Sequence, residues 1–222
     1  FNVVDQNAVM AALQTVNDPE LHRSIVALNM VQNLAVEGGK VRFDIVLTTP
    51  ACPLRATIDT DVRAALAGVP GVDDIEIGWG ADVRAASRPD APQPVEGVRN
   101  VIAVASNKGG VGKSSVSVNL AVALARLGAR VGVLDADITG PNIPTMMGIE
   151  GGVLASGQEG LHPIQAHGVS ALSIGFVLPK GTPVVWRGPM IGSGVRQCLH
   201  DVDWGELDYL IVDLPPGTSD AS

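Results

Sequence analysis

Two kinds of hydrophobic pattern divide this chain of 222 residues. In the first part, apolar side chains recur at helical spacing or alternate with polar ones, which is typical of helices and strands that bury one face. The first helical run should stop before Asp18 and Pro19, because proline disfavours the helical conformation of the residue before it. A Glu-Gly-Gly turn joins two alternating runs and predicts a β-hairpin. The predicted elements of this small α+β module are helices over residues 9–16 and 56–67 and strands over residues 31–36, 41–47 and 72–77.

The second part has a different pattern, in which strands and helices alternate. Residues 101–105 form a solid apolar run, as expected of a parallel strand that is covered on both faces. A glycine-rich turn follows, and then an amphipathic helix that Gly128 should end. Further strands are predicted over residues 131–134 and 209–212, which favours an α/β fold with a mostly parallel sheet.

A proline-rich polar stretch separates the two parts. Pro89, Pro92 and Pro94 lie in it, and a stretch of this kind cannot hold a helix or a central strand. We therefore predict three regions, which are a small α+β domain over residues 1–83, a linker over residues 84–98 and an α/β domain over residues 99–222.

The composition excludes several classes of protein. The chain is 46% hydrophobic and 17% charged, so we expect a buried core and not a disordered chain. A formal net charge of -8 disfavours general binding to nucleic acid or to an anionic membrane, so any anion site must be local. No apolar run is long enough to span a membrane. Cys52 and Cys198 lie far apart and exclude a disulfide scaffold, which fits a reducing, cytoplasmic compartment.

The strongest chemical signal is the turn Lys-Gly-Gly-Val-Gly-Lys-Ser at residues 108–114, between the apolar strand and the helix. Its glycines let successive backbone N–H groups point inward, and the helix N-terminus adds partial positive charge, so the loop favours phosphate. In this interpretation Lys113 lies against the β- and γ-phosphates and the Ser114 hydroxyl ligates Mg2+. The generic phosphate-loop pattern has a glycine where this chain has Asn107, so the match to that pattern is imperfect.

Two other interpretations of this turn compete with a phosphate loop. An ordinary strand-to-helix turn needs neither two lysines nor three glycines at this spacing. A dinucleotide site would use Gly110 and Gly112 at the start of the helix and Asp135, about 20 residues further on, for a ribose hydroxyl. That pattern has a glycine where this chain has Ser115, and it gives Lys113 no role, so a nucleoside triphosphate is favoured.

The lysine that precedes the glycines makes a family resemblance specific. Lys-Gly-Gly-x-Gly-Lys-Ser resembles the deviant phosphate loop of the MinD/ParA group of ATPases. The segments 135–144, 186–190 and 210–218 are also similar to the Mrp/ApbC family, which comprises P-loop ATPases that carry iron-sulfur clusters. This resemblance covers nearly all of residues 98–222.

The resemblance implies a role for each residue of the site. Asp137 would activate the attacking water, Asp135 would belong to the Mg2+ environment and Asp213 to the outer Mg2+ shell. Lys108 would reach across a homodimer interface to the phosphates of the partner, and it forms the catalytic set with Lys113 and Asp137. The residues predicted to bind the nucleotide are Gly109, Gly110, Val111, Gly112, Lys113, Ser114, Ser115 and Gly217.

The first domain resembles a second family. Residues 18–21 and 48–54 look like the small domain of iron-sulfur maturation factors, which is often fused ahead of Mrp-type ATPases. Cys52 lies in the second of these segments, just before a helix whose N-terminus favours a thiolate, and is a candidate iron-sulfur ligand. An inert, buried thiol is the competing interpretation. Cys198 falls on a predicted helix and is expected in the core.

Together the two resemblances predict a homodimeric carrier that hydrolyses ATP with Mg2+ and transfers [4Fe-4S] clusters to apo-proteins, with cluster scaffold proteins as further partners. Such carriers share a cluster through a Cys-x-x-Cys pair, and this chain contains none. Either the chain stops before that pair or this member lacks it, and the first is favoured, so we expect a fragment with an incomplete sheet whose cluster cysteines follow Ser222. A partitioning ATPase of the MinD/ParA kind, which needs a membrane-binding tail or a basic DNA-binding surface, and a nucleotide-switched scaffold are the alternatives.

Overall fold

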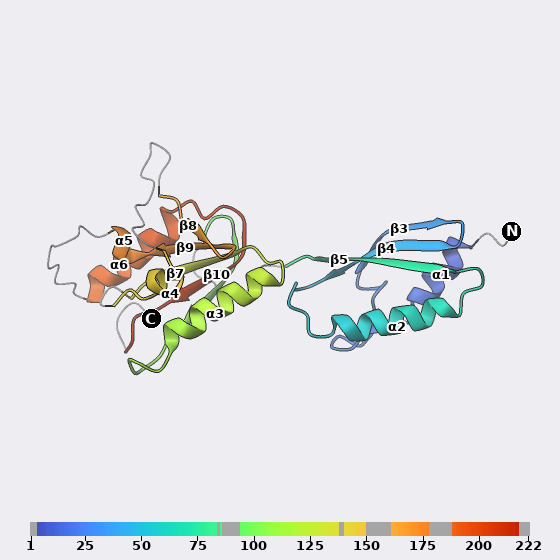
Figure 1. The fold of residues 1–222 in the computed structure, drawn as a ribbon, viewed down its shortest axis with the longest axis horizontal. Coiled ribbons are helices and arrows are strands. Elements are labelled where there is room, and N and C mark those ends of the chain that lie inside the picture. The colour runs from blue at the N-terminus through green and yellow to red at the C-terminus, as the bar shows by residue number, and fades with distance from the viewer. Residues whose placement is uncertain are drawn as a thin grey trace. The chain divides into compact units, whose positions relative to one another are not determined.

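The computed structural model describes residues 4–83, 85, 94–137, 140–149, 161–177 and 188–217. The chain forms two compact units, Phe1–Val83 and Arg84–Ser222, and each is described by itself (Figure 1). The first is a small α+β unit and the second contains a mostly parallel sheet, so the predicted fold class is confirmed. Most of the predicted linker, together with Trp186 and Arg187 of the family segment, lies outside the described residues.

The first unit has a three-stranded sheet that shares one core with two helices. Strands β3 and β4 form the predicted antiparallel hairpin, and β5 runs parallel to β4. Val41, Phe43 and Ile45 of β4 are completely buried, as their alternation with polar residues predicted. The elements are α1 (Gln6–Leu13), β1 (Asn17–Asp18), β2 (Arg23–Ser24), β3 (Val31–Glu37), β4 (Lys40–Leu47), α2 (Arg55–Ala67) and β5 (Asp74–Ala81).

Helix α1 ends earlier than the apolar spacing predicted. Its last residue is Leu13, and the Thr15 hydroxyl donates a hydrogen bond to the Ala12 carbonyl at 2.7 Å. The backbone N–H of Thr15 donates to the same carbonyl at 3.1 Å, so both donors of Thr15 close the last turn of the helix. Val16 remains buried in the core although it is no longer helical. Apolar spacing thus identified the buried residues correctly but not the end of the helix.

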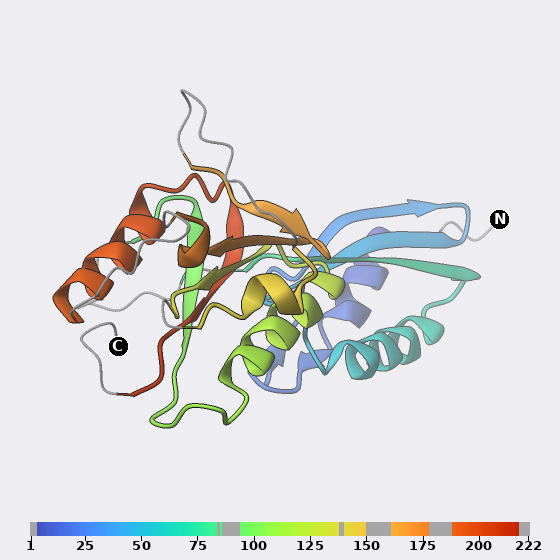
Figure 2. The same ribbon diagram turned by 60° about the vertical axis from the view of Figure 1, so that its left-hand side comes forward.

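The second unit has a five-stranded sheet in the order β6-β10-β7-β9-β8, in which only β8 is antiparallel to its neighbour (Figure 2). Strand β10, the last in sequence, therefore lies between β6 and β7. No helix in the described part of the chain is long and apolar enough to cross a membrane. The elements are β6 (Val98–Val104), α3 (Lys113–Arg126), β7 (Val131–Asp135), α4 (Ile143–Met146), β8 (Ile164–Ala166), β9 (Val169–Ser173), α5 (Ile174–Val177), α6 (Gly188–His200) and β10 (Leu207–Asp213).

Helices cover both faces of the inner strands of this sheet. On one face, Leu134, Leu172 and Leu210 form a core with residues of α6. On the other face, the core includes neighbouring strand residues such as Val133 and Ile211, together with residues of α3 and α4. Every residue of β7 and β9 is buried, which explains why such strands show no alternation in sequence.

Strand β6 departs from the prediction that it is covered on both faces. Val101 is 48% exposed, whereas Ile102 and Val104 are only partly exposed and pack against the core. Among the described strands, β6 bonds to β10 alone and so forms an edge of the sheet. For the described residues the prediction is therefore wrong, because an edge strand has fewer neighbours to cover it.

Two glycines with left-handed backbone conformations allow a test of the packing before β6. Gly97 has a φ of +71°, and an added Cβ would collide with the carbonyl oxygen of Gly205. Gly128 has a φ of +95°, and its Cβ would meet nothing within 4 Å. Left-handed strain costs an alanine about 1–2 kcal/mol, and overpacking adds about 1–3 kcal/mol.

We predict that Gly97→Ala lowers the free energy of unfolding by clearly more than Gly128→Ala, because only the first substitution adds a backbone collision to the conformational strain. Urea unfolding followed by tryptophan fluorescence measures both losses. Equal losses in the two variants would contradict this account of the contact between Gly97 and Gly205.

Candidate functional site

An open cleft of about 380 Å3 lies at the carboxyl ends of strands β6, β7 and β10. Because these strands are parallel, their carboxyl ends meet at one edge of the sheet, where ligands of α/β proteins bind. The cleft is lined by the glycine-rich loop, by Asp137 and Asn142 after β7, by Thr145 and Met146 of α4 and by Pro216 after β10. The fold therefore brings the predicted phosphate loop together with Asp137.

The glycine-rich loop has a backbone that is open toward the cleft. Gly110 and Gly112 have φ values of +76° and +94°, in the left-handed region that favours glycine. The backbone N–H groups of residues 109–115 donate to no other described residue. The last of these groups belong to the first turn of α3, a helix of 14 residues. Unpaired N–H groups at a helix N-terminus fit a phosphate.

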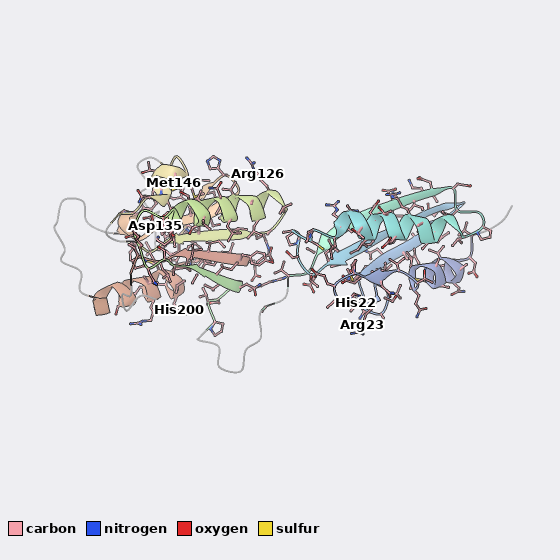
Figure 3. All side chains as sticks on the ribbon, turned by 90° about the horizontal axis from the view of Figure 1, so that it is seen from below. His22, Arg23, Arg126, Asp135, Met146 and His200 are labelled. Atoms are coloured by element: carbon pink, nitrogen blue, oxygen red, sulfur yellow. The ribbon has the colours of Figure 1, made fainter. Side chains whose placement is uncertain are left out.

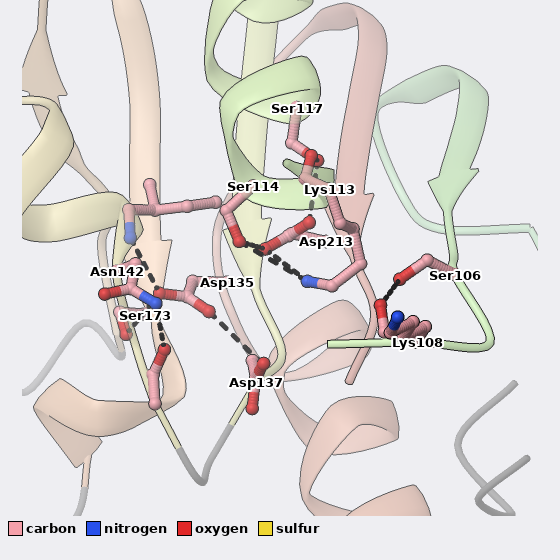
Figure 4. Close-up of polar contacts among 12 residues, drawn as sticks. Ser106, Lys108, Lys113, Ser114, Ser117, Asp135, Asp137, Asn142, Ser173 and Asp213 are labelled. Atoms are coloured by element: carbon pink, nitrogen blue, oxygen red, sulfur yellow. Dashed lines mark hydrogen bonds and ion pairs between the residues drawn. The ribbon is translucent and has the colours of Figure 1, made fainter. Parts of the chain in front are cut away.

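A buried carboxylate lies next to this loop (Figure 4). Asp213 ends β10, is completely buried and has Asp135 of β7 as its neighbour in register. Its Oδ2 accepts a hydrogen bond from Ser114 Oγ at 2.6 Å and lies 2.8 Å from Lys113 Nζ. Its Oδ1 accepts a hydrogen bond from Ser117 Oγ at 2.7 Å. The first turn of α3 thus brings the residues predicted to bind phosphate and Mg2+ onto the carboxylate predicted for the Mg2+ shell.

The oxygens around Asp213 fit a magnesium ion that a nucleotide completes. Mg2+ takes oxygen ligands and usually combines one or two protein groups with waters and phosphate oxygens. Ser114 Oγ and Asp213 Oδ2 are of this kind, and the Lys113 ammonium beside them shows that positive charge is stabilised there. Within the described residues there is no group of three His, Cys, Asp or Glu that could hold a metal ion by itself.

Asp135, which is labelled in Figure 3, is buried as well, but its partners are mainly backbone groups (Figure 4). The N–H groups of Asp137 and Ile143 each donate to its carboxylate at 3.2 Å, and the Ser173 hydroxyl donates at 3.4 Å. Burial raises the pKa of Asp135 to about 6, the two backbone hydrogen bonds oppose this rise, and the charges of Asp213 and Asp137 add to it. This carboxylate fastens the segment that leads from β7 to α4, and its role near Mg2+ stays a prediction.

The remaining predicted residues lie at or near the mouth of the cleft. Asp137 is half-buried and lines it, and so does the exposed Lys108, whose ammonium forms no ion pair with another described residue. The side chain of Val111 is 59% exposed, and the Gly217 N–H donates to the Ser106 carbonyl at 3.0 Å. Neither Val111 nor Gly217 lines the cleft, so their predicted contacts with a nucleotide stay predictions.

Two serines of the site were not identified in the sequence. Ser117 donates to Asp213, and Ser173 donates to Asp135 from the end of the neighbouring strand β9. The position of Ser117, three residues after Ser114, was an available signal, because residues at this spacing share one helix face. Ser173 gave no such signal, since only the strand order places it beside Asp135.

The two cysteines lie in different units and have different surroundings. Cys52 is half-buried in the loop before α2 and packs against the core of the first unit. Cys198 is 4% exposed, and burial raises the pKa of its thiol to about 11, so it is the core residue that its position predicted. A [4Fe-4S] cluster needs four thiolates, and this chain does not supply them by itself.

A second cleft, of about 430 Å3, lies at the other end of the same strands, where β6 and β10 begin. Its lining includes the carboxylates of Glu96, Asp201, Asp203 and Glu206. Although this cleft is slightly larger than the first, its negative charge would repel a phosphate. The loop cleft is therefore the candidate nucleotide site.

Comparison with protein families gives a match for each unit. The ParA family model, described as NUBPL iron-transfer P-loop NTPase, matches residues 97–222, which is more than half of the chain. The chain belongs to this family. A model described as iron-sulfur cluster assembly protein matches residues 6–79. Both resemblances inferred from the sequence are confirmed, and the dinucleotide interpretation of the loop is disfavoured.

Relatives of this chain are longer proteins. An iron-sulfur cluster carrier protein from Deinococcus radiodurans is 54% identical over 215 residues, and one from Synechocystis sp. is 51% identical over 220 residues. These matches cover 96% and 97% of this chain but only 60% and 62% of the relatives. A solved nucleotide-binding protein from Archaeoglobus fulgidus, in complex with ADP, is 46% identical with a TM-score of 0.50, over 57% of this chain and 49% of that chain.

The environment of Asp135 generates a pH-dependent prediction. Its pKa of about 6 in the folded protein exceeds the ordinary value of 3.8, so the folded state binds this proton more tightly than the unfolded state. The contribution of Asp135 to stability is therefore full below about pH 4 and falls by about 3 kcal/mol as the pH rises through 6. Asp135→Asn cannot ionise and should lack this component.

The measurement is urea unfolding of the ligand-free protein, with EDTA, at a series of pH values between about 4 and 7. The unfolding free energy of the wild type, minus that of Asp135→Asn, should fall as the pH rises across this range. Asp201→Asn, at an exposed carboxylate of the same unit, is the control. A difference for Asp135→Asn that does not vary with pH would contradict the assignment.

Proposed function

We propose that the protein binds and hydrolyses ATP with Mg2+ in the loop cleft, and that the state of the nucleotide controls the loading or release of a [4Fe-4S] cluster for apo-proteins in the cytoplasm. One observation carries the proposal: Lys113 and Ser114 meet on the buried carboxylate of Asp213, beside a glycine-rich loop whose N–H groups donate to no other described residue. The family and the named carriers among the relatives support the link to iron-sulfur clusters.

The residues of the cleft account for binding and orientation of a triphosphate. The N–H groups of residues 109–115 and the Lys113 ammonium would hold the phosphates, so Lys113 leaves Asp213 when nucleotide binds. Ser114 and Asp213 would hold Mg2+, which neutralises charge on the phosphate oxygens. Phosphoryl transfer depends mainly on positioning, and Asp137 in the cleft would orient the attacking water.

Lys108 supports a homodimer in this proposal. Its ammonium is exposed at the cleft and forms no ion pair within the described part of the chain. A long, flexible cation in this position can reach phosphates bound to a second copy of the chain. There it would offset the negative charge that develops during hydrolysis.

The [4Fe-4S] cluster is the cargo in this proposal. Since the chain has two cysteines and one of them is buried, the cluster would be held through cysteines outside these 222 residues. Cys52 would contribute to exchange of the cluster with a scaffold or an apo-protein. Its half-buried place in the loop before α2 supports this role, whereas Cys198 is enclosed by the core.

We predict that Asp137→Ala retains ATP binding and lowers the turnover number by about 100-fold or more, because groups that position or activate a water contribute about 10²–10⁴-fold. Lys113→Ala should instead abolish ATP binding, since it removes the charge that faces the phosphates. Calorimetric titration with MgATP and an assay of phosphate release measure the two properties. Unchanged turnover in Asp137→Ala would contradict its assignment.

Lys108→Ala is the third variant in these assays. It should bind ATP nearly as well as the wild type and lose most of its hydrolysis, because Lys108 acts on the partner's nucleotide in this proposal. Lys40→Ala, which changes a lysine of the first unit with a 46% exposed side chain, is the control. Loss of binding and hydrolysis together in Lys108→Ala would place this lysine with Lys113 and not at a dimer interface.

We predict that the full-length protein, reconstituted with iron and sulfide without oxygen, transfers a [4Fe-4S] cluster to an apo-acceptor, and that Cys52→Ser slows the transfer several-fold without changing ATP hydrolysis. Activity of the acceptor enzyme measures the transfer. Cys198→Ala removes the buried thiol and should leave the rate unchanged. A reconstituted protein that transfers no cluster would reject the carrier function, and an unchanged rate in Cys52→Ser would reject the role of Cys52 alone.

A further inference from the structure

We propose that Ser117 is a positioning residue for magnesium, which holds Oδ1 of Asp213 so that Oδ2 faces the cation position beside Ser114. This inference rests on the proposed nucleotide function and adds a residue that does not touch the ligand. The phosphate-loop pattern ends at Ser114 and does not include this serine. Three observations support this role. Ser117 contacts Asp213, its side chain is buried, and it does not line the cleft.

Ser117 and Ser114 approach the two oxygens of one carboxylate (Figure 4). Ser117 lies three residues after Ser114 on α3, so both hydroxyls are on the same helix face. Ser117 Oγ lies 2.7 Å from Oδ1 of Asp213, whereas Ser114 Oγ and Lys113 Nζ lie 2.6 and 2.8 Å from Oδ2. Each oxygen of the carboxylate therefore has its own partners, and the partners of Oδ2 are the residues that line the cleft.

The single proton of the Ser117 hydroxyl has two acceptors within reach. The Lys113 carbonyl, one helical turn back, lies at 3.2 Å, and the Asp213 oxygen lies at 2.7 Å. Hydrogen bonds to a charged acceptor are shorter and stronger than hydrogen bonds to a neutral one. The proton is therefore directed at Asp213, and the bond is part of the site and not only of the helix.

Ser117 is a partner of Asp213 that makes no contact with nucleotide or magnesium in this proposal, so binding of either leaves its bond unchanged. The Lys113 ammonium is then needed at the phosphates and the Ser114 oxygen at Mg2+. Ser117 is completely buried and does not line the cleft, so it keeps its bond. Without that bond, Oδ1 of a buried carboxylate would lack a donor, and the group could rotate to regain one. Rotation would move Oδ2 away from the cation position.

The test compares the affinity for ATP in the presence of magnesium and in the presence of EDTA, with the full chain of the wild type, Ser117→Ala and Ser117→Thr. The dissociation constant in EDTA, divided by the dissociation constant in magnesium, measures how strongly magnesium promotes ATP binding. Ser117→Ala should lower this ratio about tenfold, the scale of one hydrogen bond to a charged group, with affinity in EDTA near that of the wild type. Threonine keeps the hydroxyl and should restore the ratio.

Ser170→Ala is the matched control. Ser170 is a buried serine of β9, its hydroxyl accepts a hydrogen bond from Gln165 at 2.7 Å, and it does not line the cleft. Its loss should lower the melting temperature and leave the ratio unchanged. If Ser117→Ala does not fold, Ser117→Cys replaces it, because a thiol is only a weak donor, and a loss of the ratio in the same direction is expected.

Each outcome decides between the two proposals. A ratio that is the same in the wild type and in Ser117→Ala, or in its cysteine replacement, overturns the positioning role and leaves the proposed function intact. A lowered ratio that threonine does not restore also overturns it, because the effect then comes from packing and not from the hydroxyl. A wild-type chain that binds no ATP rejects the proposed function itself.

Discussion

A carboxylate that is removed from water must be met by hydrogen-bond donors, and Asp213 meets this constraint with one short stretch of helix. An unpaired buried carboxylate costs several kcal/mol or more, so the ends of β10 and α3 cannot separate without a large loss of stability. Lys113, Ser114 and Ser117 supply the donors that the structure describes. The glycine-rich loop enters this helix directly, and its position over the sheet therefore follows from the same contacts.

Two neighbouring carboxylates at the ends of adjacent strands have different environments and thus different tasks. Asp213 faces the ammonium of Lys113 and hydroxyl groups. These side chains can rotate, so a metal cation can take the place of the ammonium. Asp135 faces backbone N–H groups of Asp137 and Ile143, which cannot leave unless the chain itself moves. Asp213 is therefore suited to bind a cation. Asp135 is suited to set the path of the segment that carries Asp137 into the cleft.

The sequence predicted the features of the site that depend on neighbours along the chain, and it missed those that depend on strand order. The glycine-rich loop, α3 and the aspartates at strand ends each follow a local pattern. The contacts of Ser117 and Ser173 depend on the strand order as well, because β10 must lie between β6 and β7 to bring Asp213 to Ser117, and β9 must lie beside β7 to bring Ser173 to Asp135. The same reason explains β6, whose apolar run does not reveal that it is an edge of the described sheet.

The net charge of -8 raises the question of how a site for a polyanion can exist on this chain. The two ends of the strands in the second sheet answer it, because they offer different groups to an anion. At the carboxyl ends of the strands, the cleft is lined by Lys108, Lys113 and Asp137 and by loop N–H groups that donate to no other described residue. At the other ends, Glu96, Asp201, Asp203 and Glu206 line the cleft. Electrostatic attraction acts most strongly on nearby groups. The acidic surface elsewhere therefore does not oppose a phosphate at the loop, and it makes the loop cleft the favoured place for an anion on this unit.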